Sequence, residues 1–312
     1  MYMKTKYDKH GALYFNKKGK LVDCDGKVVQ LRGYSTHGLS WYPEYVNRDF
    51  FEFMRDKWHV DVVRLAMYTD EEDGYCVGSE DNKKTLLEVI DRGVRFATEL
   101  GLYVIIDWHI LRDSNPLMYM DQAADFFEKV AKKYHSYGNV FYELCNEPNI
   151  DCTWADIKKY ADTIIPIIRK YDEYAPIIVG TPSWSQHVNE AVADPIKGDN
   201  NLGYVLHFYA DTHREELRKI FSDAIAAKLP LFVSEFSICA ADGNGDGNKE
   251  EGKIWLDLMD KHQISYCMWN LGNRDESSAS FVPTCTKLTD FTDEDLNPIC
   301  KWYIDELAKR NV

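Results

Sequence analysis

Short apolar runs rich in β-branched and aromatic residues recur along this chain, and helical patterns lie between most of them. Eight runs have the length and composition of buried strands: Val28–Tyr34, Val60–Met67, Leu102–Asp107, Val140–Cys145, Ile177–Gly180, Tyr204–Tyr209, Leu231–Glu235 and Ile264–Trp269. Five of the intervening stretches have helical periodicity: Asn82–Leu100, Met118–Tyr134, Thr153–Tyr171, Thr212–Lys228 and Lys249–His262. Thr212, with Glu215 three positions later, is a helix-start signal. Strands that alternate with helices predict a parallel sheet.

The spacing of the runs predicts that this sheet is closed. Seven steps separate Tyr34 from Trp269 and average about 34 residues each, which suits a single (β/α)₈ TIM barrel of the α/β class. An open doubly wound sheet often has a glycine-rich phosphate turn after its first strand, and none follows Tyr34. We therefore expect one catalytic domain over residues 1–312. Within the extension 1–27, Ala12–Phe15 and Lys20–Asp23 should form a short hairpin that closes the N-terminal mouth of the barrel.

The balance of charge argues against several partners. The 312 residues include 37 Lys and Arg against 51 Asp and Glu, a formal net charge of −14 at pH 7, and no basic run. No nucleic-acid partner is expected, because binding to phosphates needs clustered Lys and Arg. No membrane partner is expected either, since no stretch of about 18 apolar residues exists. Met1–His10 is too polar for the apolar region of a signal peptide.

Metal sites find little support in the sequence. The eight cysteines are scattered, without a CxxC pair or the Cys and His spacing of a zinc site, so most should be buried thiols. Asp242–Gly247 resembles the start of an EF-hand loop, but Lys253 stands at position twelve, where a bidentate glutamate is needed. We therefore expect a flexible polar loop rather than a calcium site.

Polar and aromatic residues gather at the carboxyl ends of the predicted strands, where barrel enzymes place their active sites. Besides Arg64 in the second run, these are Asp107-Trp108-His109, Asn146-Glu147-Pro148, His207-Phe208-Tyr209, Ser234-Glu235-Phe236 and Trp269-Asn270. Glu147 and Glu235 follow the fourth and seventh runs, so they should face each other across the mouth. Opposed carboxyl groups suit glycoside cleavage, with retention at about 5 to 5.5 Å separation and inversion at a wider one. One glutamate must be ionised and the other protonated.

The sequence resembles glycoside hydrolase family 5, and within it the second subfamily of bacterial endoglucanases. The resemblance runs from Gly11 to about Ile304. It is carried by strings that occur in order: Leu31-Arg32-Gly33 with Ser35–Tyr42, Val63–Tyr68, Ile106–Leu111, Tyr142–Asn149, Trp184-Ser185-Gln186, His207-Phe208-Tyr209 and Trp269-Asn270-Leu271. It implies a secreted, retaining endo-β-1,4-glucanase (a cellulase) that needs no cofactor and no metal and acts on cellulose-type β-1,4-glucan or cello-oligosaccharides. We expect it to be a monomer.

The resemblance also implies a role for each residue at the centre of the site. Glu147 matches the general acid/base of the family, and Glu235 matches its nucleophile. Arg64 and Tyr209 match the residues that contact the nucleophile. Asn146 matches the residue that binds the sugar 2-hydroxyl, a contact that should strengthen at the transition state.

Further matched positions surround this centre. His207 is expected near the acid/base and His109 toward the cleaved sugar, with Trp269 as the platform on which that sugar stacks. Flat apolar sugar faces stack on aromatic rings, while charged and amide groups bind the hydroxyls. The remaining matched positions contact the sugar chain: His37, Trp41, Tyr68, Trp184, Arg274 and Glu276.

Several alternatives remain open at this stage. A β-mannanase or a mixed-linkage glucanase could use the same scaffold, because few groove contacts decide specificity. A metal-dependent barrel hydrolase would also place histidines at strand ends, although His37, His109 and His207 are isolated in the sequence. A sugar-binding module without activity is a further possibility. Glu143 shares a strand face with Glu147 and is expected to point into the barrel and pair there.

Overall fold

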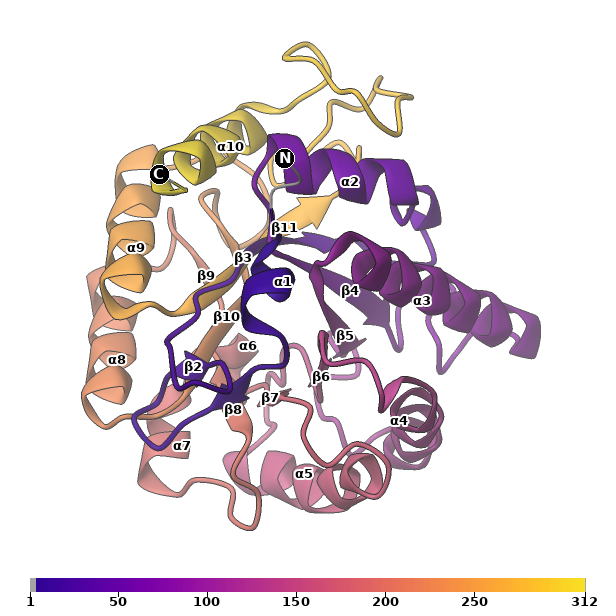
Figure 1. Ribbon diagram of the computed structural model, residues 1–312, viewed down its shortest axis with the longest axis vertical. Helices are drawn as coiled ribbons and strands as arrows, with labels where there is room; N and C mark the ends of the chain where they lie inside the picture. The colour runs from indigo at the N-terminus through magenta and orange to yellow at the C-terminus, as the bar shows by residue number, and fades with distance from the viewer. Residues whose placement is uncertain (1–3, 312) are drawn as a thin grey trace.

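Eight parallel strand positions close into a ring (Figure 1). The computed structural model describes residues 4–311, so Met1–Met3 and Val312 of the expected domain lie outside the described part. The ring consists of β3 (Arg32–Thr36), β4 (Val62–Tyr68), β5 (Tyr103–His109), β6 (Val140–Glu143), β7 (Ile177–Val179), β8 (Leu202–Val205) continued by β9 (Phe208–Tyr209), β10 (Leu231–Ser237) and β11 (Ser265–Leu271). Strand β11 pairs with both β3 and β10, which closes the ring. The predicted (β/α)₈ barrel is confirmed.

Helices surround the ring (Figure 1). The longer ones are α2 (Arg48–Lys57), α3 (Glu80–Leu100), α4 (Met120–Tyr134), α5 (Trp154–Arg169), α8 (Glu215–Ala226), α9 (Lys249–His262) and α10 (Pro298–Arg310). Short helices occur at α1 (Lys6–His10), Pro43–Tyr45, α6 (Pro182–Ser185) and α7 (Val188–Ala193). Their apolar faces pack on the strands in one large buried cluster that includes Trp58 and Trp255. The five predicted helices are present, with ends displaced by a few residues.

Local capping rules explain some helix ends and fail at another. Helix α3 begins where the Ser79 hydroxyl accepts a hydrogen bond from the Asn82 N–H, and it ends at Gly101 in the left-handed conformation. The predicted cap at Thr212 is wrong, because α8 begins at Glu215 without a side-chain cap. The Thr212 hydroxyl instead accepts a hydrogen bond of 3.0 Å from the Ala241 N–H. A tertiary contact has replaced the local one.

Two observed strands differ from the predicted ones. Val28 pairs antiparallel with Val22, so the first barrel strand begins at Arg32 rather than at Val28. The run Tyr204–Tyr209 is interrupted between β8 and β9, which pair with successive parts of β10. Apolar composition marks both segments as buried, but it does not show where strand pairing begins or stops.

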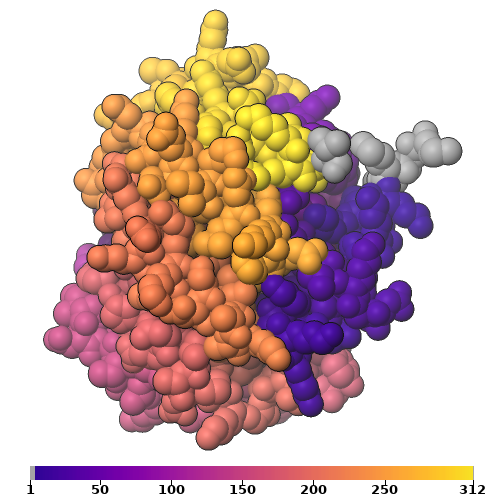
Figure 2. All heavy atoms as spheres, turned by 90° about the vertical axis from the view of Figure 1, so that its left-hand side faces the viewer, coloured from indigo at the N-terminus to yellow at the C-terminus, as the bar shows by residue number. Residues whose placement is uncertain are grey.

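A compact apolar cluster, the barrel base, fills one end of the barrel interior. Its buried members are Leu13, Phe15, Leu21, Val29, Leu31, Val62, Tyr103, Ile105, Phe141, Ile178, Val205, Phe232 and Cys267. Three of them come from the predicted hairpin, observed as β1 (Tyr14–Phe15) and β2 (Leu21–Val22). The Phe15 ring lies so close to Gly203 that a Cβ there would approach it to 2.5 Å. Figures 1 and 2 show the N-terminal segment as a layer at this end of the barrel.

The inward face of the strands changes character above the barrel base. Side chains of one face recur at every second residue. On β5, Tyr103 and Ile105 belong to the base, whereas Asp107 and His109 follow at the same spacing and are buried polar groups. On β4, Arg64 follows Val62 in the same way. The carboxyl end of the barrel therefore carries a polar layer directly on top of an apolar one.

The cysteines and the helices were each predicted to have a particular character, and the structure describes both. All eight cysteines are free thiols, and all but Cys24 and Cys76 are buried. Among residues 4–311, no helix combines the length and the apolar character that crossing a bilayer would require.

Candidate active site

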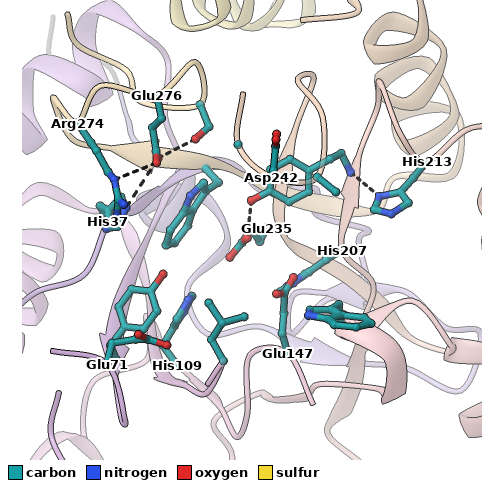
Figure 3. A pocket seen from close by; sticks show the side chains of 18 of the residues that line it. His37, Glu71, His109, Glu147, His207, His213, Glu235, Asp242, Arg274 and Glu276 are labelled. Atoms are coloured by element: carbon teal, nitrogen blue, oxygen red, sulfur yellow. Dashed lines mark hydrogen bonds and ion pairs between the residues drawn. The ribbon is translucent and has the colours of Figure 1, made fainter. Parts of the chain in front are cut away.

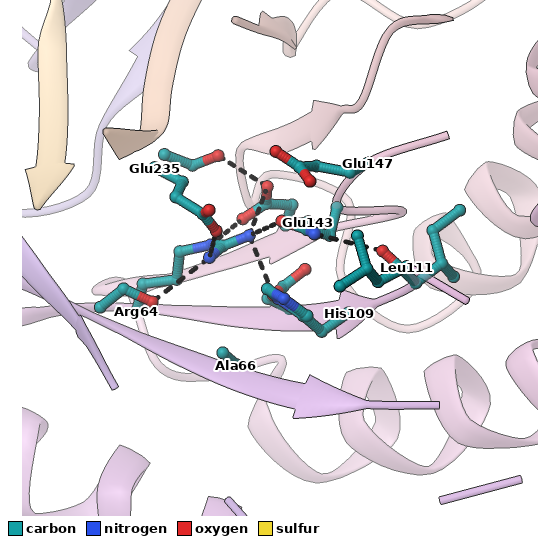
Figure 4. A network of polar contacts seen from close by, with 12 residues as sticks. Arg64, Ala66, His109, Leu111, Glu143, Glu147 and Glu235 are labelled. Carbon is teal, nitrogen blue, oxygen red and sulfur yellow. Dashed lines mark hydrogen bonds and ion pairs between the residues drawn. The ribbon is translucent and has the colours of Figure 1, made fainter. Parts of the chain in front are cut away.

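Arg64 lies at the centre of the polar layer (Figure 4). Its guanidinium donates to Glu143 through Nε at 2.7 Å and Nη2 at 3.2 Å, and to Glu235 through Nη1 at 3.0 Å. Nη2 also donates to the Asn146 side-chain oxygen and lies 3.0 Å from Asp107. Burial lowers the pKa of Arg64, but the three carboxylates raise it by more. The predicted inward pairing of Glu143 is confirmed, and a permanent positive charge lies beneath the mouth.

Both carboxylate oxygens of Glu235 accept hydrogen bonds. Tyr209 donates from its hydroxyl to Oε1 at 2.8 Å, and Arg64 donates to Oε2. Burial raises the pKa of Glu235 above its usual value, and Arg64, His109 and the Tyr209 hydroxyl limit that rise. Two donors therefore stabilise the ionised form of this carboxyl group.

Glu147 occupies a different environment on the opposite side of the mouth. Its Oε1 lies 2.9 Å from Nδ1 of His207, and Nε2 of His207 lies 2.9 Å from the Ser234 hydroxyl. Burial and then the negative charge of Glu235 raise the pKa of Glu147 well above its usual value. Burial and Arg64 lower the pKa of His207 well below its usual value, so this imidazole is neutral. Glu147 therefore holds a proton to higher pH than Glu235 does.

The two carboxyl groups approach each other closely. One carboxylate oxygen of Glu147, one of Glu235 and one ring nitrogen of His207 all lie within 4.8 Å of one another. Figure 3 shows both glutamates at the floor of the same pocket. Both are nearly buried, with Glu147 8% and Glu235 4% exposed, so their charges interact with little screening by water.

An irregularity of β10 brings Glu235 into this position. Val233 pairs with Tyr266 and Phe236 with Met268, so β10 has one residue more than β11 over this interval. Such a bulge re-aims side chains. As a result Ser234 and Glu235, although adjacent in the sequence, both contact groups inside the barrel.

Two neighbours, Asp107 and Trp269, orient His109. Its Nδ1 lies 2.6 Å from Asp107 Oδ2, and its ring stacks on Trp269 with centroids 5.3 Å apart and planes at 13°. Burial and Arg64 lower the pKa of His109 well below its usual value. Burial raises the pKa of Asp107 to about 7, although Arg64 opposes that rise. The imidazole is thus a fixed neutral group beside Glu235.

A cavity of about 690 Å³ opens over the two glutamates (Figure 3). On one side an aromatic wall is formed by His37, Trp41, Tyr68 and Trp269, with His37 and Trp269 centroids 5.0 Å apart and Trp41 and Tyr68 centroids 4.8 Å apart. Glu276 borders this wall. Its carboxylate lies 3.8 Å from Nε2 of His37 and 3.4 Å from Nε of Arg274.

Trp184 borders the other side of the cavity on a constrained turn. Ser183, Trp184 and Ser185 all have positive φ, between 55° and 58°, a conformation that is costly for residues other than glycine. Contacts with the Asn146–Pro148 segment hold the turn: the Trp184 N–H donates to Pro148 and the Ser185 hydroxyl to Asn146. Trp184 keeps 42% of its surface exposed, so its ring is available to a ligand.

The structure brings the predicted site residues together at two levels, beneath the cavity floor and in the cavity lining. Arg64 and Asn146 lie beneath the cavity floor, within the polar network. The others line the cavity: His37, Trp41, Tyr68, His109, Glu147, Trp184, His207, Tyr209, Glu235, Trp269, Arg274 and Glu276. Lining residues that sequence reasoning did not identify include Glu71, Leu111, His213, Asp242 and Ser278.

Asp242 shows why such residues were missed. It belongs to the loop expected to be flexible and polar, yet its side chain accepts a hydrogen bond of 2.9 Å from the Asn244 N–H and borders the cavity (Figure 3). Ser234 and Asp107 stand out in the sequence only as neighbours of predicted site residues, but the structure places both in the polar network. The available signal was adjacency to a strand end, which does not distinguish inward from outward side chains.

The donor set at the cavity floor does not favour a metal. Within residues 4–311, Glu147, His207 and Glu235 form the single group of three such side chains close enough to share a cation. Both oxygens of Glu235 already accept hydrogen bonds, and both nitrogens of His207 face Glu147 and Ser234. A cation would have to displace these partners. The arrangement better fits two carboxyl groups that are each held by their own hydrogen-bond partners.

The barrel and the opposed carboxyl groups beneath an aromatic groove together define the class of (β/α)₈ glycoside hydrolases. Comparison with known proteins identifies the family. The model for cellulase (glycosyl hydrolase family 5) matches residues 22–275. The chain therefore belongs to glycoside hydrolase family 5.

Individual relatives agree with this assignment. The chain is 44% identical to endoglucanase A of Butyrivibrio fibrisolvens over 98% of its own length and 70% of the relative's. It is 44% identical to an endoglucanase of Clostridium saccharobutylicum over 89% and 61%, respectively. The solved catalytic domain of a Thermobifida fusca endoglucanase superposes with a TM-score of 0.91 at 34% identity, covering 97% of this chain and 99% of that domain.

Proposed function

We propose that this protein is a retaining endo-β-1,4-glucanase in which Glu235 is the nucleophile and Glu147 is the acid/base. The proposal rests on the separation of at most 4.8 Å between carboxylate oxygens of Glu147 and Glu235. This gap suits direct attack by one carboxylate, whereas inverting enzymes hold their carboxyl groups roughly 6.5 to 9.5 Å apart to admit a water molecule.

The reaction has two steps. In the first, an Oε of Glu235 bonds to the anomeric carbon while the glycosidic C–O bond breaks, and Glu147 gives its proton to the departing oxygen. In the second, Glu147 takes a proton from a water molecule whose oxygen attacks the same carbon, and the bond to Glu235 breaks. Configuration is retained because the carbon is inverted twice.

Neighbouring groups divide the work between the two glutamates. Arg64 and Tyr209 keep Glu235 ionised and oriented through hydrogen bonds of 3.0 and 2.8 Å. The oxygen of Asn146 is bound by Arg64 and one of its N–H groups by the Ile110 carbonyl. We propose that its second N–H reaches the sugar 2-hydroxyl from just beneath the cavity floor, where a contact strengthens as charge develops on the ring.

The groove favours a chain of sugars as the substrate. Aromatic rings line the cavity in the wall formed by His37, Trp41, Tyr68 and Trp269 and again at Trp184, so we propose that sugars bind before and after the cleaved bond. We assign His37, Trp41, Tyr68, Trp269, Arg274 and Glu276 to the side of the retained sugars and Trp184 to the leaving-group side. A variant of the Thermobifida fusca domain has been solved in complex with cellotetraose, which supports a cello-oligosaccharide here.

Product analysis tests the specificity. Incubation with cellopentaose and, separately, with mannopentaose should release shorter products only from cellopentaose. A soluble substituted cellulose should lose viscosity faster than reducing ends accumulate, as expected of cleavage within chains. Cleavage of mannopentaose alone would show a β-mannanase instead. Release of products from a mixed-linkage glucan alone would show a mixed-linkage glucanase.

Two other functions make different predictions in the same assay. A metal-dependent hydrolase would lose activity in EDTA and regain it on addition of a divalent cation, whereas we expect unchanged rates. A sugar-binding module would retain affinity for cellopentaose without releasing any reducing ends. Either result would overturn the proposed chemistry.

The proposal extends to the domain organisation, the oligomeric state, the partners and the location of the protein. We propose that residues 1–312 act as one catalytic domain whose N-terminal hairpin seals the barrel base, and that the chain works as a monomer without nucleic-acid or membrane partners. A polymeric substrate cannot enter a cell, so we propose that the protein is secreted and acts outside it. Light scattering in solution tests whether the chain is a monomer. Fractionation of the producing culture tests whether the protein is secreted.

A further inference from the structure

A chain of three hydrogen bonds runs beneath the groove and ends on Glu147. The Ser234 hydroxyl lies 2.6 Å from Oε1 of Glu143. The same hydroxyl lies 2.9 Å from Nε2 of His207, whose Nδ1 lies 2.9 Å from Oε1 of Glu147. Glu143, His207 and Ser234 are between 0% and 1% exposed, so water does not compete for these contacts.

The pairing of Glu143 with Arg64 selects the direction of the hydrogen bonds in this chain. Glu143 accepts from both Nε and Nη2 of Arg64 on its two oxygens, and this pairing favours the carboxylate form although burial raises the pKa of Glu143 to about 7. Glu143 can then only accept, so Ser234 donates its single proton to it. The Ser234 oxygen must therefore accept from Nε2–H of His207. A neutral imidazole with its proton on Nε2 has a lone pair on Nδ1.

The consequence falls on Glu147. A lone pair on Nδ1 of His207 can only accept, so the 2.9 Å contact is favourable when Glu147 carries the proton. The ionised carboxylate would face that lone pair and would receive no hydrogen bond from it. We infer that Ser234 is a positioning residue that, by accepting from His207, keeps Glu147 protonated before the first step and strongly basic in the second.

This inference rests on the proposed function and adds a residue that sets the protonation state of the acid/base. The opposite arrangement of the chain can be written with the same atoms. The Glu147 proton would move to Nδ1 of His207, the Nε2 proton to Ser234, and the Ser234 proton to Glu143. Net charge would not change, but a proton on Glu143 would weaken its pairing with Arg64. Arg64 therefore holds the chain in the direction that serves catalysis.

Other charged groups also act on Glu147, and they must be kept constant in a test. They approach from five strands and comprise Arg64 and Tyr68 of β4, Asp107 of β5, Glu143 of β6, Tyr209 of β9 and Glu235 of β10. The Ser234→Ala substitution removes none of them. It removes only the acceptor for His207 and one donor to Glu143.

The test is the pH dependence of kcat/KM on an aryl cellobioside with a poor leaving group. In Ser234→Ala the His207 proton is free to move to Nδ1 and donate to the Glu147 carboxylate, which lowers the pKa of Glu147. The alkaline limb should shift to lower pH by about one unit, the size of one hydrogen bond to a charged group. Ser234→Thr, which retains the hydroxyl, should restore the limb. Ser265→Ala, a buried hydroxyl at the base of β11, should leave it in place.

Nuclear magnetic resonance of ¹⁵N-histidine-labelled protein gives an independent reading in the unsubstituted chain. At neutral pH, His207 should show an unprotonated Nδ1 and a protonated Nε2, with the order reversed in Ser234→Ala. The inference is overturned if Nδ1 of His207 is protonated in the native protein, or if Ser234→Ala leaves the alkaline limb unmoved. These results would leave the proposed function intact, because the product analysis and the EDTA experiment test that function separately.

Discussion

The two halves of the barrel interior are built from the same strands, but one half is apolar and the other is a network of buried polar and charged groups. In the barrel base, Phe141 and Phe232 pack with other apolar side chains and no charge is present in the cluster. Two residues further along the same strands, Glu143 and Ser234 belong to a buried network around Arg64. The base has many interchangeable contacts, whereas the polar layer has few, and each depends on one particular donor or acceptor.

This contrast separates stability from chemistry. Burying apolar surface favours folding whatever the exact partner. Burying Asp107, Glu143, Glu147 and Glu235 around a single cation costs desolvation energy that hydrogen bonds only partly offset. In the described chain, Asp107 Oδ1 is even buried without a hydrogen-bond partner. Such an arrangement is sensible only where shifted pKa values and fixed donors serve a reaction.

The largest expected effect is on turnover. Glu235→Gln should lower kcat by at least about 10³-fold, because the amide cannot attack the anomeric carbon. The Kd for cellotetraose, measured by calorimetry, should change little, since the groove remains. Loss of binding with normal turnover per bound substrate would contradict the assignment of Glu235.

The next effect depends on the leaving group. Glu147→Ala should lower kcat by about 10²-fold or more for alkyl cellobiosides, whose oxygen needs a proton, and much less for a dinitrophenyl cellobioside. Steady-state rates on both substrates measure the difference. Added azide should also form a glycosyl azide in the variant, because a small anion can replace the activated water. Equal losses on both substrates would argue against an acid/base role.

The pH profile sharpens the comparison between the two carboxyl groups. Activity needs Glu235 ionised, so it falls as pH drops through the pKa of Glu235. It needs Glu147 protonated, so it falls as pH rises through the pKa of Glu147, which burial and the Glu235 charge raise. A bell-shaped plot of kcat/KM should result, and a profile without an alkaline limb would contradict the order of the two values.

The barrel base should respond in stability alone. Phe232→Ala should lower the free energy of unfolding by about 3 to 5 kcal/mol, because it leaves a cavity among buried side chains. Phe232→Leu should cost less, since it leaves a smaller one. Urea titration measures both. For each variant, kcat per folded molecule should remain near that of the unsubstituted protein, and a large change in kcat would show that the halves are coupled.

The smallest expected effect concerns the rim of the groove. Trp184→Ala should raise KM for cellopentaose severalfold, about 1 kcal/mol of stacking, with less change for an aryl cellobioside, which places no sugar on the leaving-group side. Tyr174 is 74% exposed and does not line the cavity, so Tyr174→Ala is a matched control. Equal effects of the two substitutions would exclude a binding role for Trp184.

Sequence patterns predicted most of the fold because the relevant information is local. Repeated apolar runs and helical periods identify the barrel, and polar residues after the strands identify Glu147 and Glu235 as opposed. The failures arise where a distant segment decides. Thr212 is a plausible cap that Ala241 engages instead. Val28 is apolar enough for a barrel strand but pairs with Val22.

The amino-acid sequence alone shows which residues are available: two glutamates at strand ends, an arginine in the second strand, and aromatic rings in the loops. Period and composition are properties of neighbouring residues, so they can be read without a fold. The bulge in β10 that directs both Ser234 and Glu235 into the barrel interior is a property of the folded sheet. Hydrogen bonding between distant strands then decided which carboxyl group holds a proton, because a pKa depends on burial and on neighbours that the chain order does not show.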